Sequence, residues 1–78
     1  MNIEIITPDV KLFEGEGTSV KLPGKDGGFE ILNNHAPIIS TLRKGKISID
    51  LDNNQKKSFD IQEGIIEMKN NNVIILVN

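Results

Sequence analysis

The feature that most limits how this chain folds is a succession of short apolar runs, rich in β-branched residues and separated by turn residues. Isoleucine is the commonest residue, and Ala36 is the only alanine. β-branched side chains lose rotamer freedom in a helix and pack well on a pleated surface. The clearest run is residues 46–52, in which Ile47, Ile49 and Leu51 alternate with polar residues. Several such runs with turn signals between them are typical of an all-β sandwich or barrel.

Turn residues divide the remainder of the chain into further expected strands. Gly15 and Gly17 interrupt one of these and predict a bulge or a close backbone contact. Residues 38–42 also fit one helical turn by their apolar spacing, but their short length and β-branched side chains favour a strand. Residues 73–77 are apolar throughout, which predicts a strand covered on both faces. The other expected strands lie at residues 2–6, 12–22, 29–32, 58–62 and 65–69.

The small size and balanced charge of the chain exclude several classes of protein. Its 78 residues suit one domain spanning residues 1–78, and a chain of this size buries only about 60% of the surface that its unfolded form exposes. It has no cysteine and one histidine, which excludes thiolate sites and multi-histidine metal sites within one chain. The formal net charge of −2 comes from interspersed acidic and basic residues. That pattern argues against nucleic-acid binding, which needs a clustered basic excess.

No segment has the pattern of a membrane span or of a targeting sequence. The apolar runs are far shorter than the roughly 20 residues that a membrane helix needs, and the strand pattern already starts at Ile3. A basic region followed by an apolar core, as in a signal peptide, is absent. We therefore expect a cytoplasmic protein, soluble or peripherally attached to a membrane, without direct membrane insertion.

The most distinctive stretch is residues 27–39, where two apolar runs flank a polar corner. Pro37 fixes its own φ and favours extended geometry at Ala36. Asn33 and Asn34 tolerate left-handed conformations and suit a turn. The stretch therefore predicts a strand, a rigid exposed corner and a second strand.

The inventory of reactive side chains does not support catalysis. His35 has no accompanying nucleophile motif, and it is open to interpretation as a loop residue bonded to the backbone, an interface contact, or a metal ligand or base. Residues 24–28 resemble a glycine-rich loop but lack the Gly-Lys-Ser/Thr phosphate cradle and a following helix, which favours a hairpin loop. Asp50 and Asp52 share a strand face, which favours a solvated surface over an acid pair. We therefore expect no catalytic residue, no metal and no cofactor.

A carrier domain is the main alternative suggested by a motif. Glu67, Met68 and Lys69 stand between two apolar strands in a domain of about the right size for a biotinyl or lipoyl carrier. Such carriers present a lysine at a hairpin tip, often beside methionine. Here three asparagines follow Lys69, and no second methionine or small residue partners it. This favours a solvent-facing strand lysine beside a core methionine, although a generic β carrier or adaptor domain stays open.

Several motifs follow one another in a distinctive order along the whole chain. His35-Ala36-Pro37 comes after a glycine-led strand and precedes an apolar pair and then Lys44-Gly45. Further matching segments, at consistent spacing, are residues 3–8, 12–15, 63–68 and 72–76. This order resembles the epsilon subunit of bacterial F-type ATP synthases, whose mitochondrial equivalent is called delta. The chain departs from that family at Glu30, where glycine is usual, and at Asn33, where proline is usual.

The resemblance implies a flattened β-sandwich of about ten short antiparallel strands with jelly-roll-like wrapping. A pair of C-terminal helices usually follows in the family, whereas this chain stops at Asn78. We therefore expect a sandwich without the helical hairpin that inhibits hydrolysis or binds ATP in longer relatives. The implied role is a non-catalytic rotor subunit of the central stalk that binds gamma and the c-ring and couples ion translocation to ATP synthesis. The implied location is the cytoplasmic face of the bacterial inner membrane, and no small-molecule ligand is expected.

The resemblance also assigns two contact surfaces. Family positions near gamma match the first turn and the central corner of this chain, at Thr7, Pro8, His35, Ala36, Pro37 and Ile38. The part that meets the c-ring matches the loop formed by Asp26, Gly27 and Gly28. Many relatives carry glutamate at the last of these positions, so Gly28 removes a charge, and Asp26 or Glu30 is expected to replace it.

Overall fold

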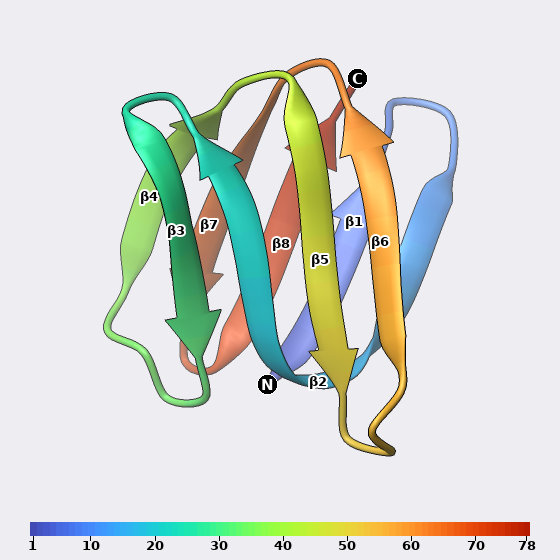
Figure 1. Cartoon of the computed structure of the whole chain (residues 1–78), viewed down its shortest axis with the longest axis vertical. Helices are drawn as coiled ribbons and strands as arrows, with labels where there is room; N and C mark the ends of the chain where they lie inside the picture. The colour runs from blue at the N-terminus through green and yellow to red at the C-terminus, as the bar shows by residue number, and fades with distance from the viewer.

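Eight β-strands and no helix make up the computed structural model, which describes residues 1–78. In chain order the strands are β1 (Asn2–Ile6), β2 (Lys11–Gly24), β3 (Gly27–Leu32), β4 (Ile38–Leu42), β5 (Gly45–Leu51), β6 (Lys56–Ile61), β7 (Gly64–Lys69) and β8 (Asn72–Val77) (Figure 1). The all-β class and the strand expected at residues 38–42 are therefore confirmed. With no helix at all, the structure contains none that is long and apolar enough to cross a membrane.

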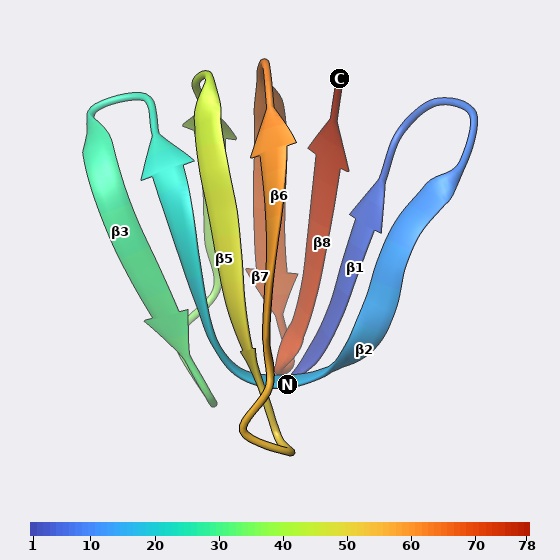
Figure 2. The same ribbon diagram turned by 45° about the vertical axis from the view of Figure 1, so that its right-hand side comes forward.

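The strands form two layers that are joined by the long strand β2. The first half of β2 pairs with β1, and its second half pairs with β3 and β5. One layer consists of β4, β7, β8, β1 and the first half of β2, and the other consists of β3, the second half of β2, β5 and β6. Figure 2 shows β2 curving beneath the sandwich from one layer into the other. The two layers enclose one core, as expected for a flattened sandwich.

The strand count is eight, fewer than the ten or so that the resemblance implies, and β2 runs unbroken from Lys11 to Gly24. Gly15 and Gly17 do not break β2; instead, its register against β5 shifts between Gly17 and Ser19. A Cβ at Gly17 would lie 2.6 Å from Ile3 Cδ1 and 3.0 Å from the Asp50 carbonyl oxygen. The predicted bulge and close contact are therefore confirmed at Gly17. A second difference is that β1 and β8 pair in parallel, whereas the other pairings are antiparallel.

Asparagine residues form the turns at one end of the sandwich. Asn34, Asn54, Asn70 and Asn71 all have positive φ, between 53° and 65°. Asparagine adopts this left-handed conformation more readily than most residues because its short polar side chain bonds locally. These turns join β3 to β4, β5 to β6 and β7 to β8, and they lie together at the lower end of Figure 1, beside the N-terminus.

The core between the layers is almost entirely aliphatic. In β5, Ile47 and Ile49 are buried and alternate with more accessible residues, as the sequence predicts. Phe13 and Phe59 pack against the core with ring centroids 5.8 Å apart, where the edge strand β6 meets the first half of β2. The fully buried side chains are those of Ile3, Ile5, Val20, Ile31, Ile47, Ile49, Ile61, Ile66, Met68, Val73 and Ile75.

One polar residue of β2 is buried although it lies on the outer face of the sheet. Ser19 shares that face with Lys21, opposite the fully buried Val20, as alternation predicts, yet it is only 6% exposed. Residues 19–21 pair in regular register with Asp50, Ile49 and Ser48, so the two-residue period holds after the bulge. The Ser19 hydroxyl donates a hydrogen bond to Asp50 Oδ2 at 2.8 Å. Lys56 Nζ lies 2.9 Å from Asp50 Oδ1, so both carboxylate oxygens have a partner.

Acid should weaken the bonds around Asp50 at a pH lower than for an ordinary aspartate. Hydrogen bonds from Lys56 and then from Ser19 hold the pKa of Asp50 below its ordinary value of 3.8. A folded-state pKa below the unfolded value means that this carboxylate stabilises the fold above about pH 4. That contribution is lost as the pH falls through the folded-state pKa. An NMR titration of the Asp50 carboxyl carbon should give a higher midpoint in Lys56→Met than in wild type. The control variant Lys57→Met should titrate like wild type. Equal midpoints in all three proteins would contradict this prediction.

Candidate functional site

The outer face of the β4-β7-β8-β1 layer carries an unusual set of exposed aliphatic side chains. Ile39 is 71% exposed, Leu76 52%, Ile65 47% and Ile74 37%. Ile65 pairs with Leu76, and Leu76 pairs with Ile6 on its other side. Directly paired residues lie within side-chain contact distance on one face of a sheet. We call the surface formed by Ile6, Ile39, Ile65, Ile74 and Leu76 the apolar face.

The apolar face is hollowed at both ends. At one end a groove of about 750 Å³ is lined by Thr7, Pro8, Ile65 and Leu76, among others. At the opposite end a depression of about 350 Å³ is lined by residues from β4 and β7 together with Pro37. Two carboxylates interrupt this face, since Glu67 lies between Ile39 and Ile74, and Glu4 pairs with Ile74 on its other side. Exposed apolar side chains gathered on one face mark an interaction site. Its shape suits a partner that lies along the strands.

The two groups of residues expected to contact gamma lie at opposite ends of the molecule. Thr7 and Pro8 are in the β1–β2 turn, whereas residues 35–37 are in the β3–β4 connection (Figure 1). The structure therefore does not bring these groups into contact with each other. Thr7 and Pro8 line the groove, and Pro37 and Ile38 line the depression at the other end. The side chains of the apolar face, with Glu67 among them, lie between the two groups.

The sequence prediction missed the apolar face because residues 73–77 were expected to be covered on both faces. That expectation is wrong, since Val73, Ile75 and Val77 point into the core whereas Ile74 and Leu76 are exposed. The signal was present in the sequence as a run that is apolar at every position. Such a run identifies a strand without a polar face but does not say whether its second face meets the same chain or another.

His35 is an exposed loop residue bonded to the backbone. Its Nδ1 lies 2.7 Å from the Ala36 carbonyl oxygen, and its backbone N–H donates to the Leu32 carbonyl at 3.2 Å. No group of three or more His, Cys, Asp or Glu side chains that could hold a metal ion lies near it or elsewhere in the structure. The interpretation as a backbone-bonded loop histidine is confirmed, and a contact role stays a prediction.

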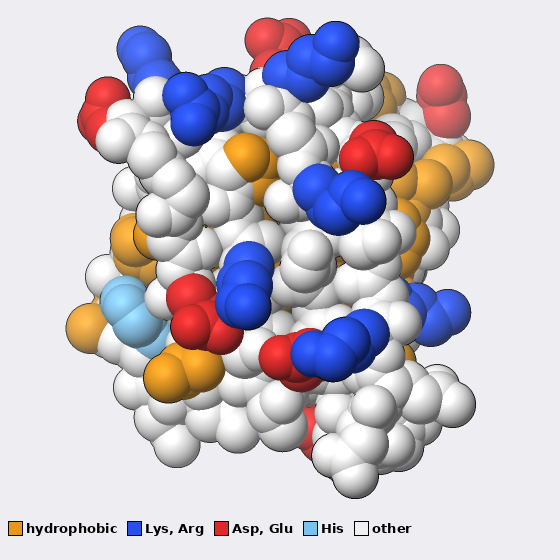
Figure 3. Space-filling view, in the orientation of Figure 1, with side chains coloured by type: hydrophobic (Ala, Val, Ile, Leu, Met, Phe, Trp, Pro, Cys, Tyr) orange, Lys and Arg blue, Asp and Glu red, His pale blue; other side chains and the backbone are white.

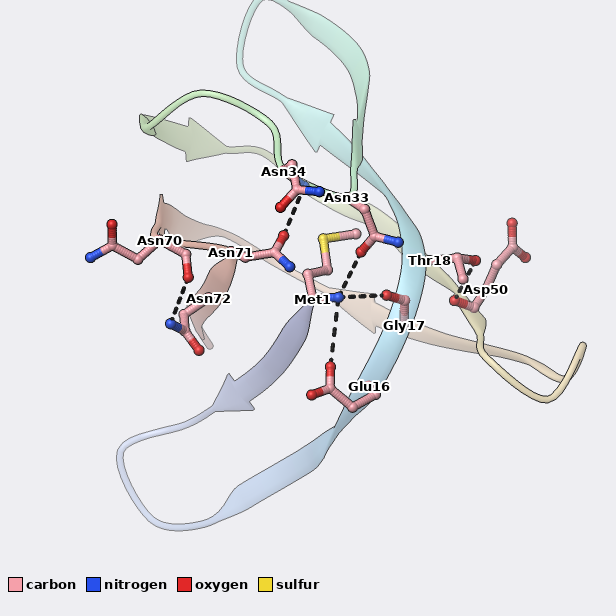
Figure 4. A network of polar contacts seen from close by, with 10 residues as sticks. All are labelled: Met1, Glu16, Gly17, Thr18, Asn33, Asn34, Asp50, Asn70, Asn71 and Asn72. Carbon is pink, nitrogen blue, oxygen red and sulfur yellow. Dashed lines mark hydrogen bonds and ion pairs between the residues drawn. The ribbon is translucent and has the colours of Figure 1, made fainter.

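A network of polar contacts fixes the corner around His35 (Figure 4). The Met1 amino group donates to the Gly17 carbonyl at 3.0 Å and to Asn33 Oδ1 at 2.6 Å. The Asn34 backbone N–H donates to Asn71 Oδ1 at 2.8 Å. The β3–β4 connection is thus held both to the start of β1 and to the β7–β8 turn. A rigid corner loses little conformational entropy when a partner binds it.

The loop expected to meet the c-ring lies at the end of the sandwich opposite to His35. Lys25 and Asp26 form the tip of the β2–β3 hairpin, and Gly27, which has φ 134°, is the first residue of β3. This confirms a hairpin loop rather than a phosphate cradle. Gly28 is exposed and pairs with Pro23, whereas Glu30 lies farther along β3, opposite Lys21. Of the two acidic residues expected to replace the missing charge, Asp26 is the one at the tip.

Lys69 does not have the position that a carrier domain requires. It is the last residue of β7 and pairs with Asn72, while Asn70 and Asn71 form the tip of the turn. Its neighbour Met68 is buried in the core at 1% exposure. The predicted solvent-facing strand lysine beside a core methionine is therefore confirmed.

Comparison with known proteins agrees with this architecture. A family model described as "ATP synthase, Delta/Epsilon chain, beta-sandwich domain" matches residues 1–78, which is the whole chain. The chain belongs to this family. Among its epsilon-chain relatives, the ATP synthase epsilon chain of Chlorobium limicola is 40% identical over 74 residues, which cover 95% of this chain and 84% of the relative. That of Caulobacter vibrioides is 38% identical over 76 residues, covering 97% of this chain and 87% of the relative.

Two solved structures share the fold of this epsilon-family sandwich. A chain of the Euglena gracilis mitochondrial ATP synthase, in a structure of OSCP, F1 and the c-ring, superposes with a TM-score of 0.89 at 16% identity. The match covers 96% of this chain and 48% of that chain. A chain in a structure of the central stalk and c-ring of the Tetrahymena thermophila mitochondrial ATP synthase superposes with a TM-score of 0.81 at 19% identity. That match covers 99% of this chain and 62% of the other. At these identities the likeness shows the fold alone.

Proposed function

We propose that this chain is the epsilon subunit of the central stalk of an F-type ATP synthase, where it binds gamma and the c-ring and couples ion translocation to ATP synthesis. Membership of the delta/epsilon family supports the proposal, as do structural neighbours that come from ATP synthase assemblies containing a c-ring. The observation that carries it is the apolar face of a compact domain with no catalytic cluster. Such a domain acts by presenting surfaces to other subunits.

The apolar face is the proposed binding surface for gamma. Covering it would remove Ile39, Ile65 and Leu76 from water, and burial of apolar surface contributes about 25 cal/mol for each Å². The surface also connects the two groups of residues expected to contact gamma, Thr7 with Pro8 and residues 35–38. A partner lying along the strands would reach both groups at once, which explains how contacts at opposite ends of the sandwich serve one interface.

The tip of the β2–β3 hairpin is the proposed contact with the c-ring. Asp26, Gly27 and Gly28 project from the end of the sandwich that also carries the groove beside Thr7. The two proposed interfaces therefore lie at the same end of the sandwich, as expected for a subunit that contacts both gamma and the c-ring. Glu30 lies back along β3 and is proposed as a peripheral part of the same contact. The proposed location is therefore peripheral to the membrane, on the cytoplasmic face of the bacterial inner membrane.

Two variants test this function. His35→Glu adds a charge to the exposed corner and is expected to weaken gamma binding about tenfold, because an unpaired interfacial charge costs desolvation energy. Gly28→Arg is expected to weaken ring binding while leaving gamma binding unchanged. The structure tolerates the arginine, since a Cβ at Gly28 would meet only the Leu22 carbonyl at 3.6 Å. Binding is measured by pull-down of gamma and of the gamma–ring complex from the same species.

The matched control is Ser58→Arg, which adds the same cation at an exposed position on the outer face of the other layer. It is expected to leave both interactions at the wild-type level. Undiminished assembly of both His35→Glu and Gly28→Arg would count against the two surfaces. Failure of the wild-type chain to bind gamma or the ring would overturn the proposed function itself.

A further inference from the structure

Two loops meet beside the proposed ring contact and form one rigid corner. The Lys25 backbone N–H donates to the Thr41 carbonyl at 3.0 Å, and the Arg43 N–H donates to the Pro23 carbonyl at 2.9 Å. These bonds join the β2–β3 loop to the β4–β5 loop. Gly45 packs closely on Pro23, since a Cβ there would lie 2.7 Å from Pro23 Cβ. The backbone of both loops is therefore fixed without any partner.

This corner displays three cationic side chains that form no ion pair within the chain. Lys25, Arg43 and Lys44 are all exposed, and we call these three residues the basic corner. None of them takes part in an ion pair, because the four ion pairs of the structure involve the Met1 amine, Lys11 and Lys56. The only acidic residue within the two loops is Asp26. Figure 3 shows several Lys and Arg side chains along the upper edge of this face, with acidic side chains beside them.

We propose that the basic corner binds carboxylate side chains on the polar loops of the c-ring. This inference rests on the proposed function and names the chemistry of one of its two contacts. The basic corner shares the β2–β3 hairpin with Asp26 and Gly28, so a ring loop that reaches the tip also reaches Lys25. An unpaired cationic cluster in a chain of net charge −2 is explained by an anionic partner, because complementary charge directs encounter and fixes register.

Protein carboxylates fit the basic corner better than the lipid surface does. Binding to anionic lipid is worth about 1 kcal/mol for each cation, and clusters of about 4–8 cations are typical of it. The basic corner has three, and Asp26 offsets one of them. A fixed backbone also brings no advantage on a fluid membrane surface, whereas it positions the Arg43 guanidinium for two parallel hydrogen bonds to one carboxylate.

Charge reversal of the basic corner tests the inference in the complete assembly. Wild type and a triple variant, Lys25→Glu, Arg43→Glu and Lys44→Glu, are titrated onto the gamma–ring complex of the same species in nanodiscs of zwitterionic phosphatidylcholine. We expect the triple variant to bind about 10- to 100-fold more weakly, because each new glutamate would repel the ring carboxylate that the original cation attracts. The wild-type affinity should fall with added salt, and that of the variant should not. Replacing the acidic loop residues of the ring by lysine should restore binding of the variant.

The control is a second triple variant, Lys21→Glu, Lys56→Glu and Lys57→Glu, which makes the same change of charge at exposed lysines outside the corner and outside the apolar face. It should bind within about twofold of wild type. Equal binding of the corner variant and wild type would overturn the inference while leaving the proposed function in place. Wild-type binding of similar strength to protein-free nanodiscs containing phosphatidylglycerol would also overturn it, in favour of lipid. If wild type fails to bind gamma alone, the proposed function fails as well.

Discussion

Ile65→Glu is expected to lower the affinity of this chain for gamma by about a hundredfold or more while leaving the domain folded. Ile65 lies at the groove end of the apolar face, where it pairs with Leu76 and lines the groove beside Thr7. A partner seated there would enclose the new carboxylate without a cation to pair with it. An unpaired buried charge costs about 3 kcal/mol or more, and about 1.4 kcal/mol corresponds to a factor of ten in affinity.

The free domain should accept the substitution because the side chain is 47% exposed before any partner binds. Calorimetric titration with gamma gives the affinity, and circular dichroism with thermal unfolding reports the fold. Leu32→Glu is the matched control, since Leu32 is similarly exposed at 55% but lies on β3, in the other layer. Leu32→Glu should bind gamma with wild-type affinity. If the two variants lose affinity equally, or neither loses any, gamma does not bind the apolar face.

Local patterns in the sequence were sufficient to predict the strands and their main turns. The alternation through Ile47 and Ile49 predicts one buried face of β5, and the structure has it. The glycines before Ser19 predict a bulge, and the register shifts there. These features depend on residues that are close to one another in the sequence, so they can be predicted from a short segment alone. The ordered motifs around His35 then identified the family, which the whole-chain match confirms.

The arrangement of the candidate site depends on contacts between strands far apart in the sequence. Leu76 joins the apolar face because β8 lies between β7 and β1, with Ile65 on one side and Ile6 on the other. The parallel pairing of β1 with β8 links the two ends of the chain, and no local pattern indicates it. The basic corner likewise forms only because Lys25 and Arg43 are brought together by backbone bonds between two loops. Periodicity alone could place none of these residues side by side.

Ile66→Ala is expected to destabilise the domain by about 2–5 kcal/mol, the range for removing a large aliphatic side chain from a packed core. Ile66 is fully buried, on the inner face of β7 between Ser40 of β4 and Ile75 of β8. A chain of this length has a total stability of roughly 4–12 kcal/mol, so the loss would be a large part of the whole. Guanidinium unfolding followed by circular dichroism should show a clear fall in the midpoint with little change in slope.

The neighbouring residue provides the control, because Ile65 and Ile66 have the same chemistry on opposite faces of one strand. Ile65→Ala removes the same atoms from a half-exposed site and should cost less than about 1 kcal/mol, since surface substitutions leave no cavity. The two positions should therefore separate cleanly: substitution of Ile65 weakens gamma binding and spares stability, whereas Ile66→Ala lowers stability and leaves the apolar face in place. Equal losses of stability would mean that Ile65 is packed in the free domain. The outer face of β7 would then be part of the core rather than a surface left for another subunit.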